Sequence, residues 1–266
     1  MQALQTLDVS VARQLRFVLT DIDDTVTTEG RLTADAYLAL EQLSAAGITV
    51  IPITGRPAGW CDHIARMWPV FGVVGENGAF YMRYDRAARK MATHHFASAA
   101  HLQSNRQKLD RLALKILQQV PGTALASDQP YRLADLAIDF CEDVAPLTER
   151  AVQQIVAMFE AAGAQAKVSS IHVNGWFGAY DKLSMTKTLF AREFGIDLQN
   201  NNENVLFIGD SPNDEPMFEF FKYPVGVANI QHQLHRLTHR PKFVTPSEGG
   251  AGFVEMADRL LFARKV

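Results

Sequence analysis

The amino-acid sequence predicts an α/β protein: a Rossmann-like sheet of parallel strands, interrupted by an inserted α+β segment. Three observations lead to this prediction. Apolar runs at residues 15–20 and 204–208 end abruptly in acidic residues, as buried parallel strands do when their carboxyl ends meet a polar site. Helical patterns follow such runs. The stretch 84–173 is patterned differently, and the chemically distinctive residues lie outside it.

The first strand, helix and strand are predicted from residues 15–53. Residues 15–20 (LRFVLT) read as a buried strand, and Thr33 is suited to cap a helix over residues 34–46. Gly47 stands where a left-handed residue ends a helix, and residues 48–53 (ITVIPI) read as the second strand. The short joints between these elements predict a right-handed parallel βαβ unit.

A similar passage is predicted near the end of the chain. Its elements are a helix over 184–194 closed by Gly195, and strands at 204–208, 225–228 and 242–245. The middle of the chain offers helices near 99–119 and 147–162 and strands near 134–141 and 167–173. We therefore predict a discontinuous core, residues 1–83 and 174–266, which carries residues 84–173 as an inserted domain.

Composition narrows the class of protein. The 266 residues are 47% hydrophobic and 21% charged, which is ordinary for a globular protein with a sizeable core. Lys and Arg number 26 against 29 Asp and Glu, so the net charge of -3 gives no general attraction for nucleic acid or an anionic membrane. Two cysteines and no apolar run of about 18 residues predict a cytoplasmic protein outside the membrane. The oligomeric state stays open.

The strongest local pattern is the acidic run that follows the first strand, from Asp21 to Thr25. Alternate residues of an extended chain share a face, so Asp21, Asp23 and Thr25 are expected to point into one site. Two carboxylates this close repel each other unless a cation intervenes, and oxygen ligands of this kind suit magnesium. A solvated acidic turn would give the same pattern.

A second acidic cluster, from Gly209 to Asp214 (GDSPND), follows the strand at 204–208. By itself it reads as a turn. Because ligands of open α/β sheets collect at the carboxyl edge of the strands, Asp210 and Asp214 are expected to meet Asp21 around one cation. This convergence is the main spatial prediction of the sequence.

Two further elements suit phosphate. Thr54, Gly55 and Arg56 close the second strand and offer a hydroxyl, an unhindered amide and a guanidinium to phosphate oxygens. Lys182 precedes the helix that leads to the Asp210 strand, where its ammonium could neutralise a carboxylate and a phosphoryl group. Lys187, on that predicted helix, is an alternative candidate for this role.

Together these motifs resemble the haloacid dehalogenase superfamily. The four motifs of that family appear in order: Asp21 to Thr25 as D-x-D-x-T, then Thr54, Lys182 and Gly209 to Asp214. The long insert follows the second motif, as it does in members with a type IIB cap. Two further motifs, Thr54-Gly55-Arg56 and Gly75-Glu76-Asn77-Gly78, resemble the Cof-like and sucrose-phosphate phosphatase subgroup of this cap type. The resemblance covers the predicted core, about two thirds of the chain. The predicted cap is much less informative.

The resemblance implies a magnesium-dependent phosphatase acting on a small phosphorylated metabolite, such as a sugar phosphate. Asp21 would attack phosphorus to form an aspartyl-phosphate, and Asp23 would act as general acid and base. Magnesium would be held by Asp21, the Asp23 backbone carbonyl, Asp210 and Asp214. Phosphate and substrate would be held by residues next to these: Thr54, Gly55, Arg56, Asn77, Lys182 and Asn213. Arg56 could instead pair with Asp62 or another acid.

Two alternatives remain at this level. A phosphomutase would use the same chemistry but return the phosphoryl group to a sugar hydroxyl. A phospho-accepting or non-catalytic binding protein would also combine acids, a threonine, a lysine and magnesium. It would need no cap, and an acid two residues after the nucleophile would shorten the life of the phosphoryl group.

Overall fold

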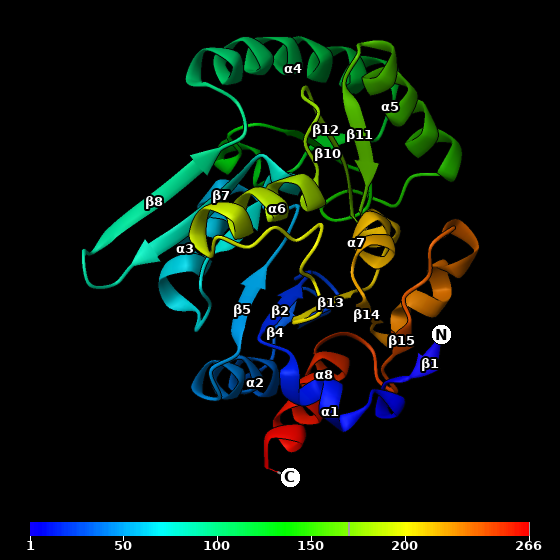
Figure 1. The fold of residues 1–266 in the computed structure, drawn as a ribbon. Helices are drawn as coiled ribbons and strands as arrows, with labels where there is room; N and C mark the ends of the chain where they lie inside the picture. Colours follow the sequence, from blue (N-terminus) through cyan, green and yellow to red (C-terminus); the bar gives the residue numbers. More distant parts are fainter. Residues whose placement is uncertain (170, 266) are drawn as a thin grey trace.

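The computed structural model has a six-stranded parallel sheet at its centre (Figure 1). The structure describes residues 1–169 and 171–265. The strand order is β1-β15-β14-β13-β2-β5, and every neighbouring pair is parallel. The strands are β1 (Gln2–Ala3), β2 (Phe17–Thr20), β5 (Thr49–Pro52), β13 (Val205–Gly209), β14 (Tyr223–Gly226) and β15 (Phe243–Val244). The predicted α/β class with a parallel sheet is confirmed.

Helices cover both faces of this sheet, because alternate residues of β2 pack to opposite sides. Val18 packs in a core with α1 (Val9–Gln14), α2 (Ala34–Ala45), α3 (Ala58–Met67) and α8 (Gly249–Lys265). Phe17 and Leu19 pack in a second core with α6 (Lys182–Glu193) and α7 (Glu215–Phe220). The sheet is therefore buried on both sides, as its apolar strands require.

The local signals in the first βαβ unit correspond to real boundaries. The Thr33 side chain accepts a hydrogen bond from the Ala36 backbone N–H and so caps α2. Gly47, just beyond the helix, has φ of +75°. Strand β2 begins two residues later than the predicted run at 15–20, and β5 one residue later than the run at 48–53.

Short pieces complete the core. A parallel bridge between Ile53 and Val74 attaches β6 (Val73–Gly75) beside β5, and β6 pairs antiparallel with β7 (Phe80–Asp85), which pairs with β8 (Lys90–His95). A small hairpin joins β3 (Thr27–Thr28) and β4 (Arg31–Leu32). The 3-10 helices are η1 (Leu4–Thr6), η2 (Glu76–Gly78), η3 (Gln129–Tyr131), η4 (Pro212–Asp214) and η5 (Ala228–Arg236).

The middle of the chain forms a separate antiparallel sheet with its own core. Its strand order is β11-β12-β10-β9, and helices α4 (Ala99–Gln119) and α5 (Glu149–Ala161) pack against it. These helices lie at the top of Figure 1, above the parallel sheet. The strands are β9 (Ala124–Leu125), β10 (Leu136–Asp139), β11 (Gln165–Val168) and β12 (His172–Trp176). We call this sheet with its two helices the cap.

The middle of the chain differs from the prediction at one strand and at the predicted domain joints. The single strand predicted at 167–173 is wrong, because the chain turns back there and forms two paired strands, β11 and β12. Ser170 within that range, and Val266 at the end of the predicted core, lie outside the described residues. The predicted joints at 83/84 and 173/174 fall inside β7 and β12, and the division into two domains stays a prediction.

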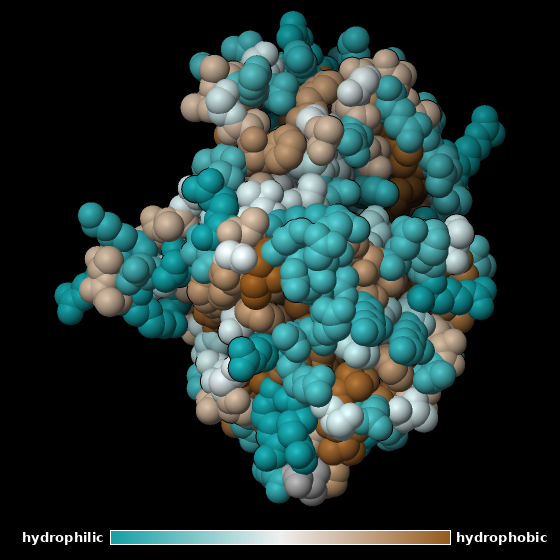
Figure 2. Space-filling view, in the orientation of Figure 1, coloured by the Kyte–Doolittle hydropathy of each residue, from teal (hydrophilic) through white to brown (hydrophobic). Residues whose placement is uncertain are grey.

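The described residues contain no helix that is both long enough and apolar enough to cross a membrane. The face seen in Figure 2 carries hydrophilic residues over the cap and the core, with smaller hydrophobic areas between them.

Candidate active site

The loop after β2 brings Asp21 to the carboxyl edge of the sheet. Its backbone N–H donates to the Ile208 carbonyl at 2.9 Å, which extends the β2–β13 ladder by one residue. Ile22 then turns into the core, with 2% of its surface exposed. Asp24 takes a left-handed backbone conformation (φ 54°), and its N–H donates to the Thr27 hydroxyl at 3.1 Å. Asp24 therefore forms part of the turn that follows β2.

Lys182 joins two acidic motifs that are distant in sequence. Its Nζ lies 2.7 Å from Asp21 Oδ1 and 2.8 Å from Asp214 Oδ1. It is the first residue of α6, whose N-terminus is capped by the Asp181 carboxylate, which accepts from the Ser184 N–H at 2.7 Å. All three groups of the bridge are buried. Lys187, the alternative candidate for this role, donates a hydrogen bond to the Gln199 side chain.

The loop after β13 supplies the other two acids. The Asp214 carboxylate folds back and accepts from the Asp210 N–H at 3.1 Å. Gly209 makes this possible, because a Cβ there would lie 2.3 Å from Asp214 Oδ2. The Asp210 carboxylate accepts from the Thr25 hydroxyl and from the Asn229 amide, each at 3.3 Å.

The carboxylates of Asp21, Asp210 and Asp214 converge. One oxygen of each lies within 4.8 Å of those of the others, and all three residues are buried. The predicted meeting of Asp21 with Asp210 is thus confirmed by the geometry. The Asp23 side chain is not part of this group.

This cluster contains three buried carboxyl groups and one buried ammonium, that of Lys182. Ionising all three carboxyl groups would leave two negative charges unbalanced. Burial raises the pKa of Asp21 to about 7, and the attraction of Lys182 offsets this only in part. Burial, followed by repulsion from Asp21 and Asp214, raises the pKa of Asp210 as well. Such a cluster could hold a divalent cation, which would remove the imbalance.

The loops after β5 and β6 lie against each other beside this cluster. Thr54 is fully buried, and its hydroxyl accepts from the Arg56 N–H at 3.0 Å. Its carbonyl accepts from the Asn77 N–H at 3.0 Å. Asn77 has φ of 54°, and its carboxamide would lie 3.2 Å from a Cβ at Gly55. Gly55 therefore gives the amide of Asn77 room beside the loop.

A cavity lies between the core and the cap, with a volume of about 40 Å³ accessible to water. The core lines it with Ser211 and with most of the predicted site residues: Asp21, Asp23, Gly55, Arg56, Asn77, Asp210 and Asn213. The cap lines it with residues that were not predicted: Arg132, Lys167, Ser169, Ile171, His172 and Asn174. Thr54, Lys182 and Asp214 lie behind this lining. Asn213 accepts a hydrogen bond from the Ser211 hydroxyl at 2.7 Å.

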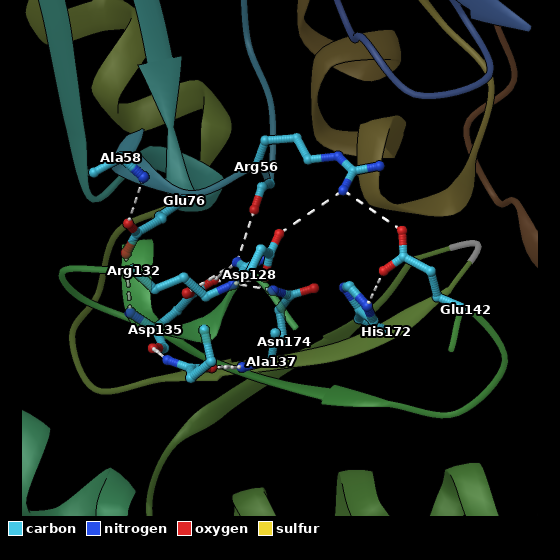
Figure 3. A network of polar contacts seen from close by, with 12 residues as sticks. Arg56, Ala58, Glu76, Asp128, Arg132, Asp135, Ala137, Glu142, His172 and Asn174 are labelled. Atoms are coloured by element: carbon cyan, nitrogen blue, oxygen red, sulfur yellow. Dashed lines mark hydrogen bonds and ion pairs between the residues drawn. The ribbon is translucent and has the colours of Figure 1, made fainter. Parts of the chain in front are cut away.

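Figure 3 shows a polar network that joins the two walls of the cavity. Arg132 is buried, donates to Asp128 and Asp135 of the cap, and reaches the Gly55 carbonyl at 3.0 Å. Asn174 donates to Asp135 at 3.0 Å. In sequence these residues look like an ordinary charged turn, and no spacing distinguishes them.

Glu76 is the second link between core and cap. Its buried carboxylate accepts four backbone N–H groups: those of Ala58, Leu133, Ala134 and Asp135, at 2.6 to 3.1 Å. Glu76 was visible in the sequence only as part of the Gly75 to Gly78 turn. Its role depends on a cap loop more than 50 residues away.

Known proteins resemble this chain in sequence and fold. Residues 181–255, which include Lys182 and the Asp210 to Asp214 loop, match the family model of haloacid dehalogenase-like hydrolases. The phosphoglycolate phosphatase of Methanobrevibacter smithii is 26% identical over 259 residues, which cover 92% of this chain and 97% of that protein.

Two solved structures show the same fold over nearly the whole chain. A haloacid dehalogenase-like hydrolase from Bacteroides thetaiotaomicron has a TM-score of 0.65 at 14% identity and covers 92% of this chain and 99% of its own. The sucrose-phosphatase of Synechocystis sp. PCC6803 has a TM-score of 0.62 at 15% identity, with coverages of 93% and 98%. Residues 181–255 are therefore similar to haloacid dehalogenase-like hydrolases in sequence, and the chain as a whole has the fold of a solved member of that family.

Proposed function

We propose that this protein is a magnesium-dependent phosphatase that hydrolyses a small phosphorylated metabolite through a phosphorylated Asp21. The observation that supports this most directly is the buried group of Asp21, Asp210 and Asp214 with Lys182 at its centre. Ionising all three carboxyl groups beside a single ammonium is costly, because charged groups lose their hydration on burial. A divalent cation held by the group would offset this cost.

The residues present fit magnesium. Oxygen donors from carboxylates are its preferred ligands, and Asp21, Asp210 and Asp214 each offer one. The Asp23 carbonyl is proposed as a further ligand. When bound, the ion supplies charge neutralisation, which lets an anionic phosphate approach an anionic nucleophile.

The proposed first step is attack by a carboxylate oxygen of Asp21 on phosphorus. The bond between phosphorus and the ester oxygen breaks, and the leaving oxygen takes a proton from the carboxyl group of Asp23. Lys182 holds the other Asp21 oxygen and balances charge beside the phosphoryl group. Gly55, Asn77 and Asn213 line the cavity and are proposed to hold phosphate or substrate, with Thr54 behind them.

The proposed second step is attack by water on the phosphorus of the aspartyl-phosphate. Asp23, now ionised, takes a proton from the water; the bond between phosphorus and the Asp21 oxygen breaks and releases phosphate. Asp23 thus returns to its starting protonation state. This second use of Asp23 is what favours hydrolysis over storage of the phosphoryl group.

The leaving alcohol would face the cap. There the cavity offers Lys167, Ser169, His172 and Asn174, all polar. These groups suit an alcohol that carries hydroxyls or a carboxylate. A sugar phosphate remains the expected class, and phosphoglycolate belongs in the test because the relative from Methanobrevibacter smithii is named for it.

The test is a panel of phosphorylated sugars and phosphorylated hydroxy acids, assayed for free phosphate with magnesium and with EDTA. We expect phosphate release from at least one ester with magnesium, its loss in EDTA, and its recovery when magnesium is added back. Isomerised product without free phosphate would support a phosphomutase instead. No turnover of any ester, in protein shown to be folded, would contradict the proposal.

A further inference from the structure

Arg56 grips the Asp23 carboxylate with one edge of its guanidinium. Its Nε donates to both oxygens of Asp23, at 2.9 and 3.1 Å, and its Nη2 donates to Asp23 Oδ1 at 2.8 Å. One edge of the planar guanidinium is therefore fully used by one carboxylate. Its face lies 4.5 Å from the centre of the Trp60 ring. Asp62, the other candidate partner, pairs with Arg66.

The other edge of the guanidinium faces the cap. Arg56 Nη1 lies 3.8 Å from Asp128 Oδ2 and 3.8 Å from Glu142 Oε1. These distances are too long for hydrogen bonds but allow strong attraction, since the Arg56 side chain is only 10% exposed. Arg56 thus stands between one acid of the core and two acids of the cap.

Both cap acids are held in place by other groups. The Asp128 carboxylate receives two hydrogen bonds from Arg132, at 2.9 and 3.1 Å. Glu142 lies 2.8 Å from His172 Nε2, and its backbone N–H donates to Asp139. The far edge of Arg56 therefore meets a fixed surface, and its position depends on where that surface lies (Figure 3).

We propose that Arg56 is a positioning residue: it orients the Asp23 carboxyl group toward the leaving oxygen, and Asp128 and Glu142 of the cap help to hold the guanidinium in the position that does so. The proposal rests on the proposed function, because it assigns Arg56 a task in that reaction. Asp23 is the less buried of the pair, with 28% of its side chain exposed, and would otherwise sample several rotamers. A misplacement of about 1 Å in such a group costs up to about a hundred-fold in rate.

The experiment compares two leaving groups in the same protein preparation. An alkyl phosphate needs a proton on its leaving oxygen, whereas p-nitrophenyl phosphate leaves readily without one. With enzyme in excess and magnesium present, single-turnover release of the alcohol reports the first step alone. For Arg56→Ala we expect the alkyl ester to slow by roughly 10- to 100-fold and p-nitrophenyl phosphate by no more than about 3-fold.

Two further variants sharpen the result. Arg56→Lys keeps the charge but cannot form the two-pronged contact, so it should show the same selective loss. The double variant Asp128→Asn with Glu142→Gln keeps Arg56 and Asp23 and should show a smaller loss with the same selectivity. Because each result is a ratio of two esters on one preparation, a partly unfolded sample does not produce it.

Arg66→Ala is the matched control. Arg66 also contacts a carboxylate through Nε and Nη2, that of Asp62, and lies over an aromatic ring, that of Tyr84, but on the surface. It should change neither rate. Equal slowing of both esters by Arg56→Ala, or no slowing, would overturn the positioning role. If the wild-type protein releases neither alcohol, the proposed function itself fails.

Discussion

Asp21 in the core cluster and the carboxylates in the wall formed by the cap differ in how many hydrogen bonds they receive. In the cap wall Asp128 and Asp135 each receive two or more hydrogen bonds from side chains, and Glu76 receives four from backbone N–H groups. In the described core cluster, Asp21 receives one side-chain hydrogen bond, from Lys182. The first kind of carboxylate is saturated and therefore structural. The second retains capacity for a cation and a phosphoryl group.

The largest effect should come from replacing the proposed nucleophile. Asp21→Asn removes the carboxylate that is proposed to attack phosphorus but keeps the size of the side chain, so turnover should fall by roughly a thousand-fold or more. Phosphate release from the best ester of the panel measures this. A melting temperature close to that of the wild type shows that the fold is intact. Wild-type turnover by the variant would refute the covalent mechanism.

Lys182→Ala should follow in size. It removes the ammonium from between Asp21 and Asp214, and a charge-balancing group of this kind is worth roughly 10²- to 10³-fold in kcat. Lys187→Ala is the matched control on the same helix, because Lys187 Nζ bonds Gln199 at 3.1 Å and lies over the Phe220 ring. Equal losses of kcat in the two variants would contradict a role for Lys182 in the reaction.

Glu76→Gln tests how much a carboxylate with a full set of hydrogen bonds contributes to stability. The new amide NH₂ would face backbone N–H donors that now have an acceptor, so the variant should lose about 2–4 kcal/mol of unfolding free energy. Urea unfolding at unchanged m-value measures this. Asp62→Asn, which breaks an exposed pair with Arg66, should cost less than about 1 kcal/mol. Similar costs for the two variants would mean that the network contributes little.

The smallest effect is expected at the open end of the cavity. Lys167 is exposed on β11 and lines the cavity, and its contact with a polar or anionic alcohol should be weak. Lys167→Ala should raise KM by roughly 3- to 10-fold and leave kcat nearly unchanged. Lys115→Ala, on α4 outside the cavity lining, should change neither. A large fall in kcat would place Lys167 in the chemistry instead of in substrate binding.

The core site was accessible to sequence analysis because its parts are local. Asp21 and Asp210 directly follow apolar strands, and the rule that parallel strands end at one edge brings them together. The boundaries of α2 followed equally from Thr33 and Gly47, since capping depends on a few adjacent residues. The cap offered no such rule. The pattern at 167–173 predicts one strand where the structure has parts of two, β11 and β12, because no glycine or proline in that stretch marks a break.

The amino-acid sequence by itself determined the α/β class, the strand-end acids and the order of the four motifs, because these depend on periodicity and on neighbours along the chain. Tertiary structure alone decided that Arg56 meets Asp23 rather than Asp62, and that Lys182 reaches Asp21 across 161 residues. It also decided that Glu76 binds the cap. A charged side chain has several possible partners in sequence, and only packing of distant segments determines which one remains with it when water is excluded.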